Sequence, residues 1–204
     1  MKKNKISKNW INKQKRDIYV RESKIQGYRS RSAFKLIEID KKFSLFKKNI
    51  KFLDLGAAPG GWAQVASKNI KNGKILSVDI KYMDPIDNVD FLKGDFTDTK
   101  IQEKIFNYFG TRIDLLVSDM ALNTTGNKNL DSFTTGNLSI LAMDFASNIL
   151  KKEGIFVSKI FMGSIFDEIR KKAEKVFKNI KIFKPSSSRK ESKENYIICK
   201  NLSN

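Results

Sequence analysis

A glycine-rich segment, Asp54–Trp62 (DLGAAPGGW), has the composition of a turn that binds a small ligand. Its glycines let the backbone turn sharply and approach a ligand, and the helix-length stretch that follows would present free N–H groups. The segment has neither the G-x-G-x-x-G spacing of a dinucleotide site nor the ending of a phosphate-binding loop. It contains no lysine, and Pro59 removes one N–H donor. The pattern favours a nucleotide-type ligand without phosphate groups, although a plain tight turn has the same composition.

Two carboxylates lie at the ends of the next apolar runs of the chain. Asp79 follows Gly56 by about 20 residues, the spacing at which a carboxylate accepts the hydroxyls of an adenosine ribose. Asp95 ends the third run, where it would meet the adenine edge. A glycine-rich turn, two such carboxylates and no phosphate cradle predict S-adenosylmethionine as the ligand. Two aspartates that only cap helices would have the same positions.

A second pair of polar residues belongs to the fourth and fifth apolar runs. Asp119 follows the fourth run, and Lys159 lies inside the otherwise apolar fifth. Because lysine is rarely buried without a partner, we expect Lys159 to lie near Asp119 and to be functional. A lysine whose stem packs while its ammonium reaches water is the alternative. The chain has no histidine, and Cys199 is its only cysteine, so acid–base chemistry falls to carboxylates, lysine or tyrosine, and a Cys/His zinc site is excluded.

The elements that would position these residues follow from the hydrophobic periodicity. Short apolar runs alternate mostly with helix-length stretches, which predicts an α/β fold with a mostly parallel sheet and helices on both faces, in one domain over residues 1–204. Two irregular stretches, Leu122–Asp131 and Pro185–Asn195, follow strands or strand–turn units, where ligands bind in such sheets. The expected strands are Lys51–Leu55, Lys74–Ile80, Val89–Leu92, Ile113–Ser118, Ile155–Ile160, Ile180–Lys184 and Tyr196–Lys200. The expected helices are Ser30–Phe46 with Ser30 as N-cap, Pro59–Ile70, Asp98–Phe109, Ser132–Leu150 and Ser164–Lys178.

The first 31 residues form a basic arm. They hold eleven lysines and arginines against two acids, in a chain whose formal net charge is +18. Such an arm predicts contact with a polyanion such as RNA, and a solvated lysine-rich tail is the alternative. Trp10, Tyr19 and Tyr28 interrupt the charges, which favours an ordered segment. No apolar run is long enough to cross a bilayer, so we expect a soluble, intracellular protein.

The motifs together resemble the FtsJ-type RNA 2′-O-methyltransferases, in particular the bacterial enzymes of large-subunit ribosomal RNA. The resemblance covers nearly the whole chain from about Trp10, and the ordered set of motifs is very specific. It implies a Rossmann-like S-adenosylmethionine-dependent methyltransferase fold with a seven-stranded sheet. The motifs are Gly27, Ser30–Leu36 (SRSAFKL), Asp54–Trp62, Met83–Ile86 (MDPI), Val89–Phe96 (VDFLKGDF), Ser118–Ala121 (SDMA), Lys159 and Ser187–Arg189 with Glu194 and Tyr196.

The resemblance also implies the site residues. The family's catalytic Lys-Asp-Lys-Glu tetrad matches Lys35, Asp119, Lys159 and Glu194. The implied cofactor contacts are Gly56, Pro59, Gly60, Trp62, Asp79, Asp95 and Asp119. Two residues depart from the family pattern: Leu122 stands where many relatives have proline, and Met162 where the bacterial enzymes have glutamine. Both flank catalytic strands, which bears on substrate recognition more than on chemistry.

The expected function is S-adenosylmethionine-dependent 2′-O-methylation of a ribose, that of a uridine in large-subunit ribosomal RNA. Methylation of transfer RNA is an alternative, and a catalytically silent RNA-binding factor for ribosome assembly is an alternative of another class. The expected partner is ribosomal RNA or the ribosomal particle, with no metal and no membrane, and the protein is expected to be a monomer. The expected compartment is the cytoplasm, with an organelle or the nucleus as alternatives.

Overall fold

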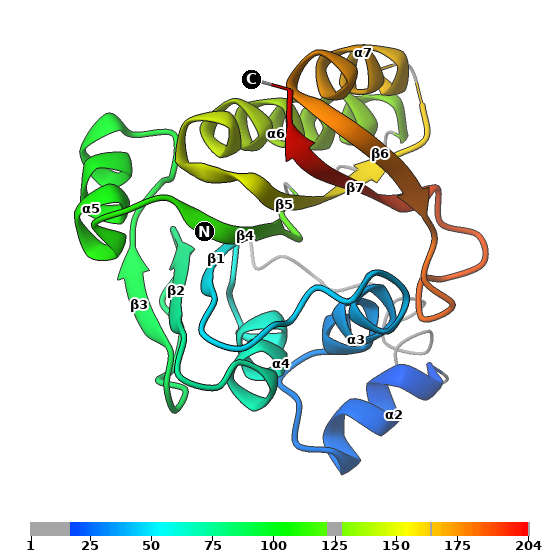
Figure 1. The fold of residues 1–204 in the computed structure, drawn as a ribbon. Helices are drawn as coiled ribbons and strands as arrows, with labels where there is room; N and C mark the ends of the chain where they lie inside the picture. Colours follow the sequence, from blue (N-terminus) through cyan, green and yellow to red (C-terminus); the bar gives the residue numbers. More distant parts are fainter. Residues whose placement is uncertain (1–16, 122–127, 164, 204) are drawn as a thin grey trace, which may run out of the picture.

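The computed structural model describes residues 17–121, 128–163 and 165–203 (Figure 1). Residues 1–16 of the predicted basic arm and Leu122 lie outside these residues. The helices are α2 (Ile18–Ile25), α3 (Ser32–Phe43), α4 (Gly61–Asn69), α5 (Thr99–Phe109), α6 (Lys128–Ile149) and α7 (Phe166–Val176). The strands are β1 (Lys51–Leu55), β2 (Lys74–Asp79), β3 (Asp90–Lys93), β4 (Ile113–Ser118), β5 (Leu150–Phe161), β6 (Phe177–Phe183) and β7 (Glu194–Leu202).

The seven strands form one sheet in the order β3-β2-β1-β4-β5-β7-β6. The pairs from β3 to β5 are parallel, and β7 runs antiparallel to both β5 and β6. Strands β6 and β7 are antiparallel neighbours because a loop joins them, whereas a parallel pair needs a longer crossover. The predicted mostly parallel seven-stranded sheet is confirmed.

Helices cover both faces of the sheet, as predicted (Figure 1). Helices α3 and α4 bury Leu36, Trp62 and Val65 on one face. Helices α5, α6 and α7 bury apolar side chains such as Ile105 and Ile169 on the other. The sheet is therefore shielded from water on both sides, which explains why its central strands read as continuous apolar runs.

Some predicted boundaries are wrong. Ser30 does not cap α3: the N-cap is Arg31, and the Ser30 hydroxyl instead lies 2.6 Å from that of Ser32. The helix ends at Phe43, three residues early, because Ser44 takes a left-handed conformation. Helix α2, inside the basic arm, was not expected as a helix, and Asp17 caps it by accepting the N–H of Tyr19.

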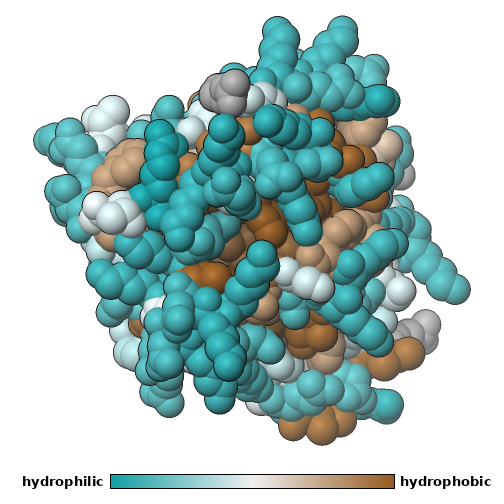
Figure 2. Space-filling model, viewed as in Figure 1, coloured by the Kyte–Doolittle hydropathy of each residue, from teal (hydrophilic) through white to brown (hydrophobic). Residues whose placement is uncertain are grey.

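Hydrophilic residues cover most of the face seen in Figure 2, with hydrophobic residues between them. The charged side chains of this lysine-rich chain therefore lie largely at the surface, as their hydration requires. Within the described ranges, no helix is both long and apolar enough to cross a bilayer.

Candidate active site

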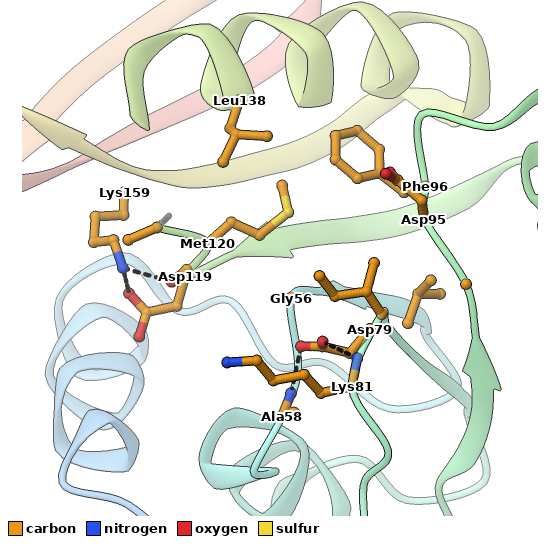
Figure 3. A pocket seen from close by; sticks show the side chains of 14 residues that line it. Gly56, Ala58, Asp79, Lys81, Asp95, Phe96, Asp119, Met120, Leu138 and Lys159 are labelled. Atoms are coloured by element: carbon orange, nitrogen blue, oxygen red, sulfur yellow. Dashed lines mark hydrogen bonds and ion pairs between the residues drawn. The ribbon is translucent and has the colours of Figure 1, made fainter. Parts of the chain in front are cut away.

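A pocket of about 380 Å³ lies at the carboxyl ends of the parallel strands (Figure 3). This is the edge of an open α/β sheet at which ligands bind, and the volume is within the range of small-molecule sites. Residues after β1, β2, β3 and β4 line it together with parts of β5 and α6. The lining residues are Gly56, Ala58, Val78, Asp79, Ile80, Lys81, Gly94, Asp95, Phe96, Asp119, Met120, Ala121, Leu138 and Lys159.

The two carboxylates predicted to bind the cofactor both line this pocket. Asp79 accepts the backbone N–H of Ala58 at 2.9 Å and that of Lys81 at 2.7 Å, one on each carboxylate oxygen. Asp95 accepts the N–H and the hydroxyl of Thr97 at 2.9 and 2.7 Å. These local hydrogen bonds fix both carboxylates in place. Each Asp79 oxygen accepts one bond and keeps a lone pair for a ligand, whereas at Asp95 both bonds fall on Oδ1, so that a ligand would meet Oδ2.

Three of the expected cofactor residues do not line the pocket. Trp62 is 2% exposed, and its indole N–H donates to the carbonyl of Ser32 at 2.9 Å, toward α3. A Cβ added to Gly60 would lie 2.7 Å from Ile86, so this glycine allows close packing between loops. Pro59 is exposed. The first turn of α4 therefore faces α3. Trp62 and Gly60 are buried beside the pocket, whereas Pro59 lies at the surface outside the pocket lining.

Lys159 and Asp119 form an ion pair at the edge of the pocket (Figure 3). The Lys159 ammonium lies 3.0 Å from Asp119 Oδ1 and donates to the Asp119 carbonyl at 2.5 Å. The Tyr196 hydroxyl donates to the same carboxylate oxygen at 2.7 Å. Lys159 and Tyr196 can share this partner because they are register neighbours on β5 and β7. The expected approach of Lys159 to Asp119 is confirmed.

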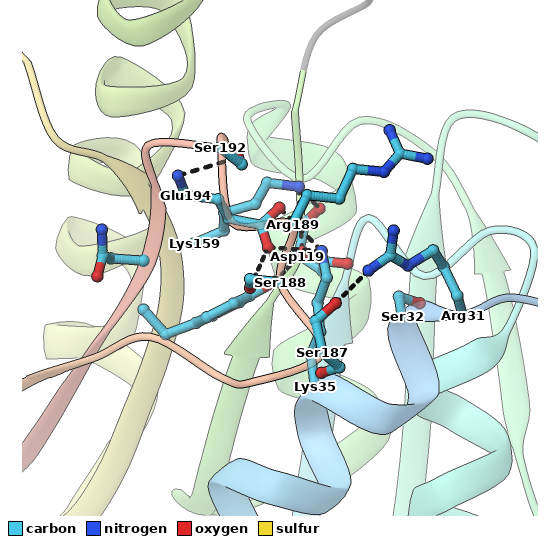
Figure 4. Close-up of polar contacts among 12 residues, drawn as sticks. Arg31, Ser32, Lys35, Asp119, Lys159, Ser187, Ser188, Arg189, Ser192 and Glu194 are labelled. Atoms are coloured by element: carbon cyan, nitrogen blue, oxygen red, sulfur yellow. Dashed lines mark hydrogen bonds and ion pairs between the residues drawn. The ribbon is translucent and has the colours of Figure 1, made fainter. Parts of the chain in front are cut away.

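Lys35 and Glu194 form a second buried pair beside the first (Figure 4). Lys35 Nζ lies 2.8 Å from both carboxylate oxygens of Glu194, and the Ser188 hydroxyl donates to Oε1 at 2.7 Å. Lys35 also lies over the Tyr196 ring, 5.8 Å from its centroid. The structure therefore brings the four tetrad candidates together, with Tyr196 between the two pairs. Sequence reasoning gave Tyr196 no role, since its contact depends on the β5–β7 register.

The electrostatics of the cluster favour an ionised Asp119. Burial alone would raise the pKa of this carboxyl, but Lys159, Lys35 and the hydrogen bond from Tyr196 together hold it below its ordinary value. Burial raises the pKa of Tyr196 well above its ordinary value, and the charges of Asp119 and Glu194 raise it further. Tyr196 is therefore a neutral hydrogen-bond donor that supports the Asp119 carboxylate.

Asp54 is a buried carboxyl at the end of β1 that sequence reasoning assigned no role. It is 1% exposed, and its Oδ2 has no hydrogen-bond partner in the described part of the protein. Burial raises its pKa well above the ordinary value, and the charges of Asp119 and Asp79 add to the shift. The sequence could have indicated a role for Asp54, because Asp54 is the first residue of the glycine-rich segment.

The pocket suits S-adenosylmethionine, the predicted cofactor, better than a cofactor that carries phosphate groups. Its charged residues are Asp79, Asp95 and Asp119 against Lys81 and Lys159, so acceptors for hydroxyls and cationic groups predominate. S-adenosylmethionine carries ribose hydroxyls, an ammonium and a sulfonium, which such acceptors suit. Among the residues described, no group of three acidic, cysteine or histidine side chains could hold a metal ion.

The sheet order and the pocket at its carboxyl edge define the class of the Rossmann-like methyltransferases. An S-adenosylmethionine-dependent methyltransferase from Corynebacterium glutamicum shares this fold at 20% identity, with a TM-score of 0.55 over 95% of this chain and 96% of that one. A crystal structure of a candidate ribosomal RNA methyltransferase from Plasmodium falciparum is 34% identical, with a TM-score of 0.76, over 86% of this chain and 98% of that one.

The sequence comparisons define the family. The model of the FtsJ-like methyltransferase family matches residues 28–202. A relative from Pelagibacter ubique, named ribosomal RNA large subunit methyltransferase E, is 59% identical over 202 residues, which cover 99% of this chain and 100% of the relative. The chain belongs to the FtsJ-like methyltransferase family.

Proposed function

We propose that the protein transfers a methyl group from S-adenosylmethionine to the 2′ hydroxyl of a uridine in large-subunit ribosomal RNA. The observation that carries the proposal is the Lys159–Asp119 pair at the edge of the pocket. In the proposed complex, this pair would meet both a substrate hydroxyl and a methyl donor bound beside Asp79. Family membership and the name of the Pelagibacter ubique relative support ribosomal RNA over transfer RNA as the substrate.

The cofactor would be held by the carboxylates and the apolar walls of the pocket. Asp79 would accept the ribose hydroxyls, Asp95 would meet the adenine edge, and Phe96 and Leu138 supply apolar contacts. Asp119, held ionised, would attract the cationic end of the ligand. When bound, this cofactor supplies a methyl group on a sulfonium, a leaving group that needs no protonation. The protein must therefore only orient the hydroxyl and take its proton.

The geometry of Lys159 suits the transfer of that proton. The Lys159 nitrogen donates to the carbonyl of Asp119 and lies within reach of the Asp119 carboxylate. These two contacts occupy two of the three positions on the nitrogen that are not bonded to carbon. The Lys159 ammonium would first have to give up one proton to solvent. The resulting neutral amine could keep both N–H bonds and direct its lone pair at the ribose hydroxyl. As the oxygen–carbon bond forms and the sulfur–carbon bond breaks, the hydroxyl proton would pass to Lys159.

Lys35 and Glu194 are proposed to position the target ribose. Both are about nine-tenths buried and joined at 2.8 Å, so Glu194 fixes the ammonium of Lys35 beside Tyr196. Misplacing a reactant by about 1 Å can cost roughly 10²-fold in rate, which is comparable with the lower end of the contribution of proton transfer. The basic arm at residues 1–31 is proposed as an RNA contact of this single methyltransferase domain.

The test combines transfer in vitro with mapping in cells. Labelled S-adenosylmethionine would be supplied with large-subunit ribosomal RNA, large ribosomal particles or transfer RNA, and 2′-O-methyl positions would be mapped in total RNA with and without the gene. We expect transfer to ribosomal RNA or to the particle, and loss of one ribose methylation without the gene. Transfer to transfer RNA alone would support that alternative, and RNA binding without transfer would support the silent assembly factor.

A further inference from the structure

The carboxylate of Asp17 lies between two arginines that come from distant parts of the chain. Asp17 Oδ2 accepts hydrogen bonds from Arg31 Nη1 and, at 3.3 Å, from Arg189 Nε. Asp17 Oδ1 accepts the N–H of Tyr19 and thereby caps α2. The Asp17 side chain is only 9% exposed, whereas that of Arg189 is 28% exposed. One carboxylate oxygen thus accepts hydrogen bonds from two guanidinium groups, of which that of Arg189 is the more exposed.

The arginine pair lies directly beside the proposed catalytic cluster. Arg31 Nη2 donates to the carbonyl of Ser187, and the next residue, Ser188, donates to Glu194. Figure 4 shows both guanidinium groups on the same side of this cluster. We therefore expect an RNA whose target ribose reaches Lys159 to pass its backbone close to Arg31 and Arg189.

We propose that Arg31 and Arg189 form a binding site for a backbone phosphate next to the target nucleotide, and that Asp17 competes with this phosphate for the two arginines. This inference rests on the proposed function, because it names the part of the RNA that the site recognises. Binding of RNA exchanges the carboxylate for the phosphate and releases the start of α2 from Arg189.

The chemistry of the three groups favours the exchange. Guanidinium groups bind phosphate bidentately, and a phosphodiester offers two oxygens where Asp17 offers one, because its other oxygen caps α2. Arg31 Nε is buried and has no hydrogen-bond partner among the residues described, so the carboxylate leaves part of the guanidinium unsatisfied. If the ion pair had only a structural role, we would expect Arg31 Nε to have a hydrogen-bond partner, as buried polar groups usually do.

The decisive variant is Asp17→Asn, because asparagine caps a helix as well as aspartate does and removes only the charge. Asp98→Asn is the matched control: Asp98 caps α5 in the same way, by accepting the N–H of Lys100, and its loss changes the net charge equally. Arg189→Gln tests whether Arg189 is one of the two arginines for which Asp17 and the phosphate compete. Affinity for a labelled oligouridylate would be measured over a salt series, and thermal melting would confirm folding, with Asp17→Ser as a second capping variant.

Asp17→Asn should bind the oligouridylate about fivefold more tightly, the factor that one competing ion pair of about 1 kcal/mol gives. Its salt slope should steepen by up to about 0.7, the contribution of one phosphate on a single strand. Asp98→Asn should change the affinity less than twofold. In the Arg189→Gln background the gain from Asp17→Asn should shrink, because only Arg31 is then left to be freed.

Three results would overturn the inference: no gain beyond that of Asp98→Asn, a gain that is undiminished with Arg189→Gln, or no binding of oligouridylate by the unmodified protein. Methyl transfer to ribosomal RNA by the unmodified protein, measured in parallel, separates the two claims. Transfer without the Asp17→Asn gain rejects only the phosphate site. The gain without transfer to any RNA rejects only the proposed function.

Discussion

Lys159→Met removes the proposed proton acceptor while keeping most of the volume of the side chain. The substitution deletes the contacts at 2.5 and 3.0 Å to Asp119, which leaves that carboxylate with the hydroxyl of Tyr196 and the charge of Lys35. Loss of a general base costs about 10²–10⁴-fold in rate. Because Asp119 keeps these partners and is 17% exposed, we expect unfolding free energy to fall by about 2 kcal/mol, less than for an isolated buried charge.

The assay is single-turnover transfer of a labelled methyl group to ribosomal RNA, with cofactor affinity measured separately by titration calorimetry. Lys151→Met is the matched control, because Lys151 lies on the same strand and pairs with Asp114 at the surface, 46% exposed. We expect the control to keep its rate within about twofold, as exposed ion pairs contribute little. A Lys159→Met rate within tenfold of the unmodified protein, with unchanged cofactor affinity, would refute the role assigned to Lys159.

Three further predictions concern the carboxylates. Glu194→Gln removes the charge that neutralises buried Lys35, so the unfolding free energy should fall by about 2–3 kcal/mol in denaturant titration; an unchanged midpoint would contradict this. Asp79→Asn should weaken S-adenosylmethionine binding by about 1–3 kcal/mol in calorimetry, and equal affinity would reject its role. Burial raises the pKa of Asp54, so the folded protein binds a proton at this carboxyl more tightly than the unfolded chain does. The contribution of this proton to the unfolding free energy is fully present below about pH 4, the usual pKa of an aspartate, and is lost as the pH rises. The Tm of Asp54→Asn, relative to that of the unmodified protein, should therefore rise between about pH 4 and 8. A difference in Tm that does not change with pH would exclude the coupling between Asp54 protonation and folding.

The order of elements could be predicted because strands buried on both faces are continuous apolar runs. The runs at Lys51–Leu55 and Ile113–Ser118 match β1 and β4 at both ends. The start of β5 could not be predicted, because three exposed charged residues, Lys151 to Glu153, follow Leu150 and hide the strand. Helix α2 was hidden for a similar reason, since charges interrupt its weak apolar face.

Different parts of the site depended on different kinds of information. The approach of Lys159 to Asp119 could be predicted, because adjacent parallel strands end at the same edge of a sheet. Lys35 and Glu194 were predicted as site residues only from the family resemblance. Their ion pair was not predicted, since 159 residues separate the two in the chain. The contact of the Trp62 indole with Ser32 could not be predicted, because a motif does not tell which way the first turn of a helix faces.

The antiparallel direction of β7 is what completes the cluster. In the β5–β7 register, Phe161 pairs with Glu194 and Lys159 with Tyr196, so the first residues of β7 lie at the carboxyl edge of β5. A parallel strand in the same place would begin at the opposite edge, with its first residues far from Asp119. The reversal therefore lets Tyr196 support Asp119 and lets Glu194 hold Lys35, and it places the β6–β7 loop, with Ser188 and Arg189, beside the pocket's edge.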